Sequence, residues 1–352
     1  MKKKIFFTYD PVMPYFTFPF HIRQSSKSVY LSPVPAETLV KEISEGFIRQ
    51  LDRLLSIPEH FKAVLFNSQL EFYSFLSSVF YSSGSLHPIH GDRGKDWSGL
   101  LRQWNFHPVD TPVNLEQKSE RPKYSKPDLP VHIFLNEPGS GSCLTADYVD
   151  QMSWYAEGAF IHGDLTDCVP GTVSHLDKFT SFSFGFSSSF GLPFNKVIWF
   201  VNDRIFEDFL IAFKGRLPAN QIHHLSPGFY CFGAYDLLFM DVSAKVFTDM
   251  HSRGLKNIIN ETKYKAAIIE QAVSGNPVFL PAVKDPMYRS MTTIVLKYQG
   301  VSEDIVSQFG RHGIVTDKLA TGGSQQKLRI TNFPVHSKEQ FEMMADLIQN
   351  AN

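Results

Sequence analysis

The alternation of short apolar runs with segments of helical period is the feature that most constrains this fold. Apolar runs of strand length occur at 131–135, 159–162 and 196–201. A helical pattern over 146–156 lies between the first two runs. Strands that alternate with helices favour an α/β protein with a mostly parallel sheet, whose functional sites lie at the carboxyl ends of the strands.

The amino-terminal part of the chain is predicted to pass from loops into a helix, a strand and a second helix. Residues 1–35 are rich in proline and aromatic residues and lack helical periodicity, so an extended arm with loops is expected there. Over 36–55, apolar side chains recur every three or four residues, which predicts an amphipathic helix that ends before Pro58. A short strand over 61–66 and a buried helix over 71–81 follow.

The carboxyl-terminal part is predicted to form a separate small α/β domain. A long helical region runs from after Tyr230 to about Ile259, and a second helix covers 261–273. Strand and helix patterns then alternate at 291–297, 303–310, 326–331 and 338–349.

Size and composition limit the classes of protein that remain. At 352 residues the chain exceeds the usual size of one domain, so one large and one smaller domain are expected. The net charge is −1 with acidic and basic residues interleaved, which argues against a nucleic-acid interface or an anionic membrane surface. No stretch approaches the roughly 18 apolar residues of a membrane helix, and the lysine-rich start lacks the apolar region of a signal peptide. We therefore expect a cytoplasmic protein.

Cysteine and serine motifs give little support to metal or hydrolytic chemistry. Cys143, Cys168 and Cys231 are far apart and show no zinc-ligand spacing, so no metal site is expected. The serine-rich run 185–189 differs from a nucleophile elbow because its last position is not glycine. The 32 phenylalanines are typical of core and subunit-interface packing.

Three segments of the sequence carry motifs in a shared order and spacing. Residues 54–66 hold a helix end, Ile-Pro and a strand, and residues 133–141 hold a strand that ends in Asn-Glu. The longest segment, 163–203, begins next to an aspartate and passes through two glycines around a serine run. Together with weaker similarity over 256–273 and 322–332, these segments resemble the class V aminotransferases, and most closely the phosphoserine aminotransferases.

This resemblance covers nearly the whole chain and implies a fold and a set of partners. The fold is the type I fold of pyridoxal-phosphate (PLP)-dependent transferases, an α/β fold with a mostly parallel sheet in the large domain. The large domain spans 16–255, and 1–15 with 256–352 form the small domain. The resemblance further implies a homodimer with active sites between subunits, PLP or pyridoxamine phosphate as cofactor, and a small amino-acid or phosphorylated ligand.

The resemblance places two decisive positions in the longest segment. Asp164 matches the aspartate that pairs with the pyridine nitrogen and keeps it protonated; the alternative is a capping or surface aspartate at a strand end. Ser188 matches the lysine that forms the Schiff base, and Ser187 matches the glutamine before it. A serine forms no imine, and its hydroxyl is too weak an acid to move the catalytic proton. Lys178 and Lys196 are the nearest lysines, and neither reaches the cofactor without a change of backbone path.

The phosphate loop and two contacts near it also differ from the family pattern. Ser68 can contact a phosphate, but the loop has no glycine, and Glu71 would repel the anion. Ala36 stands where the family has an arginine that grips the substrate carboxylate. Pro138 replaces the threonine that follows Asn-Glu.

Two further site positions keep alternatives open. Trp97 matches the ring that covers the cofactor, although Arg93 competes for this position and Trp97 can equally be helix packing. Arg329 matches the arginine that binds the α-carboxylate, with Lys327 as the competing alignment.

The sequence therefore predicts a phosphoserine aminotransferase-like protein that is impaired or inactive in transamination, and that binds a ligand or partner as a dimer. The alternative is an active aminotransferase of the phosphoserine:2-oxoglutarate type that uses a non-covalent cofactor or a displaced lysine. A third hypothesis, unrelated catalysis in the same cleft, has no residues that support it.

Overall fold

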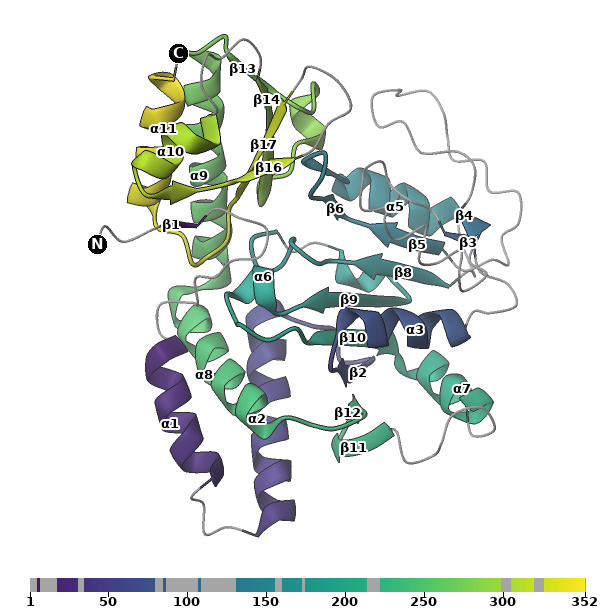
Figure 1. The fold of residues 1–352 in the computed structure, drawn as a ribbon. Coiled ribbons are helices and arrows are strands. Elements are labelled where there is room, and N and C mark those ends of the chain that lie inside the picture. The colour runs from purple at the N-terminus through teal and green to yellow at the C-terminus, as the bar shows by residue number, and fades with distance from the viewer. Residues whose placement is uncertain are drawn as a thin grey trace.

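The computed structural model describes residues 5–6, 18–30, 35–79, 85–86, 107–108, 131–155, 160–172, 175–213, 222–298, 305–319 and 326–351. Figure 1 shows a large part around a central sheet and a smaller part that carries the carboxyl terminus. Within these residues the central sheet has seven strands in the order β11-β12-β2-β10-β9-β8-β5. Their bounds are β2 (Phe61–Phe66), β5 (Val131–Phe134), β8 (Ile161–Asp164), β9 (Ser181–Gly185), β10 (Val197–Asn202), β11 (Ile222–Ser226) and β12 (Phe229–Phe232).

Most strands of the central sheet run in one direction. Strands β5, β8 and β9 are parallel to one another, and β2 is parallel to β12. Strand β10 is antiparallel to both β9 and β2, which gives these two groups a common direction, and β11 also runs against them. The predicted mostly parallel sheet is confirmed.

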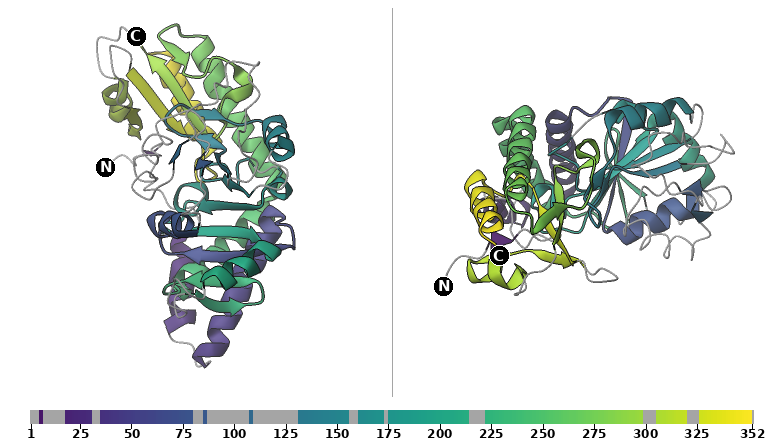
Figure 2. Two further views of the ribbon diagram at one scale, coloured as in Figure 1. Left: turned by 90° about the vertical axis from the view of Figure 1, so that its right-hand side faces the viewer. Right: turned by 90° about the horizontal axis from the view of Figure 1, so that it is seen from above.

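Helices cover both faces of this sheet (Figure 2). One face packs against α2, α5 and α8, and the other against α3 and α7. The helices of this part are α1 (Phe18–Tyr30), α2 (Ala36–Leu55), α3 (Gln69–Val79), α5 (Ala146–Tyr155), α6 (Ser187–Phe190), α7 (Asp203–Phe213) and α8 (Leu237–Arg253), with the 3-10 turn η1 (Leu176–Lys178).

The smaller part has its own antiparallel sheet and hydrophobic cluster. Its strand order is β13-β14-β17-β16, and α9 and α11 pack on it. The bounds are α9 (Leu255–Ser274), β13 (Phe279–Pro281), η2 (Pro286–Tyr288), β14 (Thr293–Tyr298), α10 (Ile305–Arg311), β16 (Asp317–Leu319), β17 (Gln326–Thr331) and α11 (Lys338–Gln349). Short pairs join β1 (Ile5–Phe6) to β15 (Ile314–Val315), β3 (Ser85–Leu86) to β4 (His107–Pro108), and β6 (Asn136–Glu137) to β7 (Ser142–Cys143).

The expectation of an extended arm over 1–35 is wrong over α1. Pro19 is the second residue of this helix, where a missing N–H costs no intrahelical hydrogen bond. The helix is held by tertiary contacts that sequence periodicity does not show. His21 Nε2 lies 2.6 Å from Asp249 Oδ2, and Ile22 packs against the large core.

The predicted bounds of the long helix between Tyr230 and Ile259 are also wrong, at both its start and its end. Tyr230 lies in strand β12, and α8 starts only after Asp236, whose carboxylate accepts a hydrogen bond of 3.0 Å from the Phe239 N–H as an N-cap. The helix ends at Gly254, whose φ of 82° favours glycine, and α9 begins at the next residue. The helices and strands predicted at 36–55, 61–66, 146–156, 326–331 and 338–349 are confirmed to within a few residues.

Phenylalanine rings form the core between the central sheet and helices α2 and α8. The ring centroid of Phe186 lies 5.9 Å from Phe47, 5.1 Å from Phe239 and 6.1 Å from Phe247. All four side chains are fully buried. Phe186 is the residue before α6, so this ring cluster fixes the position of the serine-rich turn.

Among the described helices, none is both long and apolar enough to cross a membrane.

Lys265 in α9 is a buried cation in the smaller part. Its side chain is 1% exposed, and Nζ donates hydrogen bonds of 3.0 Å to the carbonyl oxygens of Phe333 and His336. The same Nζ lies 5.3 Å from the centroid of the Phe341 ring. Burial lowers the pKa of Lys265 from 10.5 to about 8, because the charged form loses its hydration.

Replacing Lys265 with methionine should remove a pH-dependent part of the stability. Between about pH 8 and pH 10.5 the unfolded lysine binds more protons than the folded one, so this group makes the free energy of unfolding rise with pH. The rise should be on the order of 3 kcal/mol in the wild type and absent in Lys265→Met. Denaturant unfolding of both proteins across this range measures it, and tyrosines and cysteines that titrate in both cancel in the difference. An unchanged pH slope in the variant would contradict the assignment.

Candidate functional site

The candidate site lies where the carboxyl ends of several strands meet at one edge of the central sheet. Phe66 at the end of β2 pairs with Val197 at the start of β10, and Val197 also pairs with Gly185 at the end of β9. Asp164 ends β8 and pairs with Ser183 of β9. The residues that follow β2, β8 and β9 are therefore brought to a common edge, as the parallel arrangement predicts.

Asp164 is a buried carboxylate with two donors from the protein. Its side chain is 2% exposed, which excludes the alternative of a surface aspartate. Oδ1 accepts a hydrogen bond of 2.8 Å from the Thr166 N–H, and Oδ2 accepts a short hydrogen bond from the Tyr73 hydroxyl on α3. Its backbone oxygen also accepts from the Leu135 N–H at 3.1 Å.

Two buried histidines lie on the same face of the sheet as Asp164. His162 precedes Asp164 by two residues, and its Nδ1 and Nε2 lie 2.8 Å and 3.1 Å from the hydroxyl oxygens of Ser181 and Ser183. The His132 ring lies 4.7 Å from the His162 ring, centroid to centroid. Burial and His132 lower the pKa of His162 well below its usual value, so His162 is neutral. No sequence motif marked these two residues; the only signal was the strand alternation with Asp164.

Ser68 and Glu71 close the amino terminus of helix α3. The Ser68 hydroxyl accepts a hydrogen bond of 3.1 Å from the Glu71 N–H, and Glu71 Oε2 accepts one of 2.7 Å from the Asn67 N–H. Gly233 passes close by with a φ of 71°, and a Cβ there would lie 3.3 Å from Glu71 Oε1. The Ser68 hydroxyl therefore serves as a helix cap, and its contact with a phosphate stays a prediction.

Lys196 is the lysine nearest to the serine-rich turn in sequence, and the structure places its backbone beside that turn. The Phe186 N–H donates to the Lys196 carbonyl oxygen at 3.1 Å, which places Lys196 beside α6. Its Nζ donates to Asn67 Oδ1 at 2.7 Å and lies 3.7 Å from Asp236 Oδ2, with the side chain 14% exposed. The amine is therefore engaged by neighbours at the end of β2 and the start of α8.

Lys178 lies far from the serine-rich turn along the sheet. It ends η1, just before β9 begins, whereas α6 follows the other end of β9. Its Nζ lies 4.0 Å from Asp150 Oδ1, and the side chain is 41% exposed. Lys178 is a solvated lysine at the opposite edge of the sheet, so it is not a substitute for an amine at Ser188.

The remaining predicted site residues lie on several elements. Ser187 and Ser188 are the first residues of α6, and Ser187 is half-buried. Arg329 is half-buried on β17 of the smaller sheet, where it pairs with Val295 and Asp317. Trp97 lies outside the described residues. The roles of Arg329 and Ser187 in ligand binding stay predictions.

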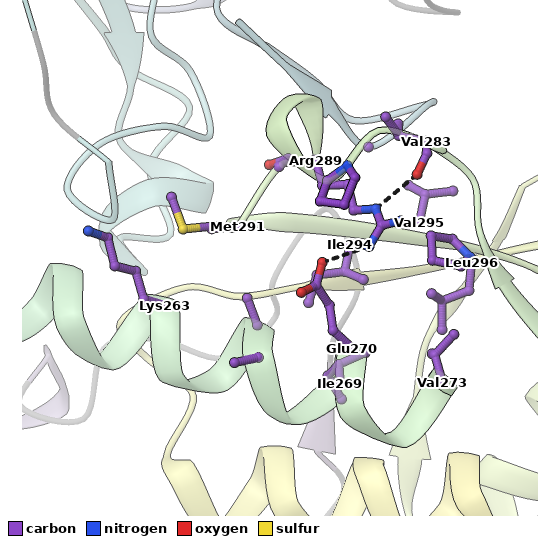
Figure 3. A pocket seen from close by; sticks show the side chains of 16 residues that line it. Lys263, Ile269, Glu270, Val273, Val283, Arg289, Met291, Ile294, Val295 and Leu296 are labelled. Atoms are coloured by element: carbon purple, nitrogen blue, oxygen red, sulfur yellow. Dashed lines mark hydrogen bonds and ion pairs between the residues drawn. The ribbon is translucent and has the colours of Figure 1, made fainter. Parts of the chain in front are cut away.

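A cavity of about 210 Å³ lies away from this edge, between α9 and strand β14 (Figure 3). Its walls are mostly apolar, and Arg289 and Glu270 lie at its rim. Arg289 Nη1 lies 3.1 Å from Glu270 Oε1, and Nε and Nη2 donate to the carbonyl oxygens of Val283 and Lys284. The guanidinium is thus bound by the protein itself.

At the positions that the resemblance assigns, three features differ from those of a site for lysine-bound pyridoxal phosphate. The turn after β9 offers hydroxyls and no amine. The Glu71 carboxylate lies at the helix terminus where a phosphate would bind. Asp164, the expected partner of the ring nitrogen, already accepts the Tyr73 hydroxyl. The structure therefore supports no reaction step through this cofactor.

Comparison with solved structures shows the fold of phosphoserine aminotransferases. A phosphoserine aminotransferase from Cytophaga hutchinsonii superposes with a TM-score of 0.86 at 21% identity, covering 99% of each chain. A PLP-bound phosphoserine aminotransferase from Trichomonas vaginalis gives 0.74 at 14%, covering 98% of this chain and 99% of that one. A ureidoglycine–glyoxylate aminotransferase from Bacillus subtilis gives 0.74 at 13%, covering 99% and 92%. No model of a protein family and no curated protein matches the chain. The predicted type I transferase fold is confirmed.

The three thiols should be poor nucleophiles in the native protein. Burial raises the pKa of Cys143 to about 11 and of Cys231 to about 12, and it raises that of Cys168 well above 9.0. At pH 8 the thiolate fraction of Cys143 should be ~100-fold below that of a free cysteine. Reaction with a chromogenic disulfide reagent should therefore be slow until denaturant is added, when three thiols react. Rapid labelling of one thiol in the folded protein would show a reactive cysteine instead.

Proposed function

We propose that this chain is a phosphoserine aminotransferase-like protein that does not carry out lysine-dependent transamination and binds a small ligand at the candidate site. The turn between Gly185 and Gly191, where the resemblance places the Schiff-base lysine at Ser188, carries this proposal. A hydroxyl cannot form the imine or transfer the proton that a lysine amine would. The chain contains no lysine between 179 and 195.

A second candidate function is an active aminotransferase that uses Lys196 in place of the missing amine. The hydrogen bond between the Phe186 N–H and the Lys196 carbonyl favours it, because it brings Lys196 to the same sheet edge as α6. The contacts of Nζ with Asn67 and Asp236 oppose it, since the amine would have to leave both to attack a carbonyl group.

An absorption spectrum with added PLP should separate these two functions. If the chain only binds a ligand, the spectrum stays that of free PLP. Borohydride treatment then fixes PLP on no lysine, and peptide mapping finds no modified peptide. In the second, an imine band appears, and the trapped peptide contains residue 196. Lys196→Met is the matched variant, because methionine has an unbranched side chain of similar length and no amine. A trapped wild-type peptide that disappears in this variant would establish the second function.

We further propose that the protein acts as a homodimer with the candidate site near the subunit contact. Leu70 on α3 is 55% exposed and Tyr235 before α8 is 44% exposed. The two lie on neighbouring segments, since Gly233 approaches both Asn67 and Glu71. Contiguous exposed apolar patches are typical of interaction surfaces, and we propose that these two side chains belong to one such patch.

The double variant Leu70→Glu/Tyr235→Glu should weaken the dimer. Introduced carboxylates on a self-complementary contact would face like charges and lose apolar burial, so the dissociation constant should rise at least ~10-fold. Sedimentation equilibrium of wild type and variant measures this. Met343→Glu, at an exposed position on α11, is the control and should leave the mass unchanged. A monomeric wild type would remove the proposal.

A further inference from the structure

We propose that helix α3 carries built-in substitutes for a cofactor: the Glu71 carboxylate stands in for the phosphate, and the Tyr73 hydroxyl for the protonated ring nitrogen. This inference rests on the proposed function and deepens it, because it explains why the site would stay closed to pyridoxal phosphate even with a lysine at position 188.

The first substitute lies in the first turn of α3, and its carboxylate binds an N–H two residues before the helix begins. The free N–H groups of a helix start attract anions, which is how such a terminus can hold a phosphate. Here the anion is internal: Glu71 Oε2 accepts from the Asn67 N–H at 2.7 Å, while the Glu71 N–H donates to Ser68 Oγ at 3.1 Å. Gly233 has no side chain and a φ of 71°, which leaves room for Glu71 Oε1 beside it.

The charges around this terminus also oppose a phosphate. The cation of Lys196 lies 3.7 Å from the Asp236 carboxylate, and its Nζ donates to Asn67. Glu71 and Asp236 together carry two negative charges against the one positive charge of Lys196. A phosphate dianion placed among them would meet a negative cluster, and like-charge contact strongly disfavours binding.

The second substitute satisfies Asp164. Its Oδ2 accepts the Tyr73 hydroxyl and its Oδ1 accepts the Thr166 N–H, so each carboxylate oxygen has a donor. Tyr73 is 1% exposed, and its ring packs 5.2 Å from Phe72 and 5.7 Å from His132 between centroids. A pyridinium that paired with Asp164 would compete with this packed phenol for the acceptor sites of Oδ2.

Glu71 and Tyr73 are two residues apart on one helix, so the position of α3 sets both contacts at once. A different interpretation is that Tyr73 only orients Asp164 for a cofactor and that Oδ2 stays available. The two interpretations predict opposite effects. If Tyr73 blocks the site, removal of its hydroxyl strengthens cofactor binding; if it orients Asp164, removal weakens binding.

The test uses PLP as the probe in titrations of the full-length protein, followed by absorption and borohydride trapping. Ser188→Lys alone should bind PLP poorly. The triple variant Glu71→Ser/Tyr73→Ser/Ser188→Lys should bind at least ~10-fold more tightly and trap PLP on the peptide that contains residue 188. The conservative set Glu71→Gln/Tyr73→Phe/Ser188→Lys keeps the packing of α3 and should shift affinity in the same direction if the serine set fails to fold. Met343→Ala/Ser188→Lys, at an exposed position on α11 away from the candidate site, is the control and should match Ser188→Lys.

Equal or weaker binding by both triple variants, relative to Ser188→Lys, would overturn the inference and leave the proposed function intact. An imine in the wild-type protein would instead contradict the proposed function itself. Inorganic phosphate gives a separate readout for one end of the site: it should raise the thermal midpoint of Glu71→Gln but not of the wild type.

Discussion

A carboxylate buried in a protein core needs hydrogen-bond donors, and Asp164 meets this need by joining three parts of the large domain. Its backbone belongs to β8, one oxygen is bound by the Thr166 N–H in the following turn, and the other by Tyr73 from α3. Asp164 therefore links α3 to the sheet by a hydrogen bond, beside the apolar cluster that packs this helix on the sheet. The neighbouring His162 stays neutral and is bound by serine hydroxyls, so no second charge has to be neutralised there.

The aromatic core on the opposite face fixes the other half of the candidate site. Phe186 is clamped by Phe47, Phe239 and Phe247, and the serine-rich turn starts at the next residue. The serine-rich turn is the segment to which the resemblance assigns the Schiff-base lysine, and the chain has no lysine between 179 and 195.

The regular elements with strong local patterns were predictable from the sequence, and contacts between distant segments were not. Helix α2 and strand β2 followed from apolar spacing, and the place of Asp164 and the serine turn followed from motif order. Helix α1 was missed because its stability comes from His21 and Ile22 contacts with the rest of the chain. Glu71 was recognised as unfavourable for a phosphate, but its role as a cap, like the bond between Tyr73 and Asp164, depends on how α3 lies against the sheet.

The glycine between α8 and α9 has a consequence for how the chain can be divided. Ile258, in the first turn of α9, is buried with the large core, whereas Ala266 and Ile269 of the same helix are buried with the small core. If the chain were cut at Gly254, the large core would lose the side chain of Ile258. The piece that carries α9 would then expose this apolar residue. Helix α9 therefore contributes side chains to both hydrophobic cores, on either side of its middle.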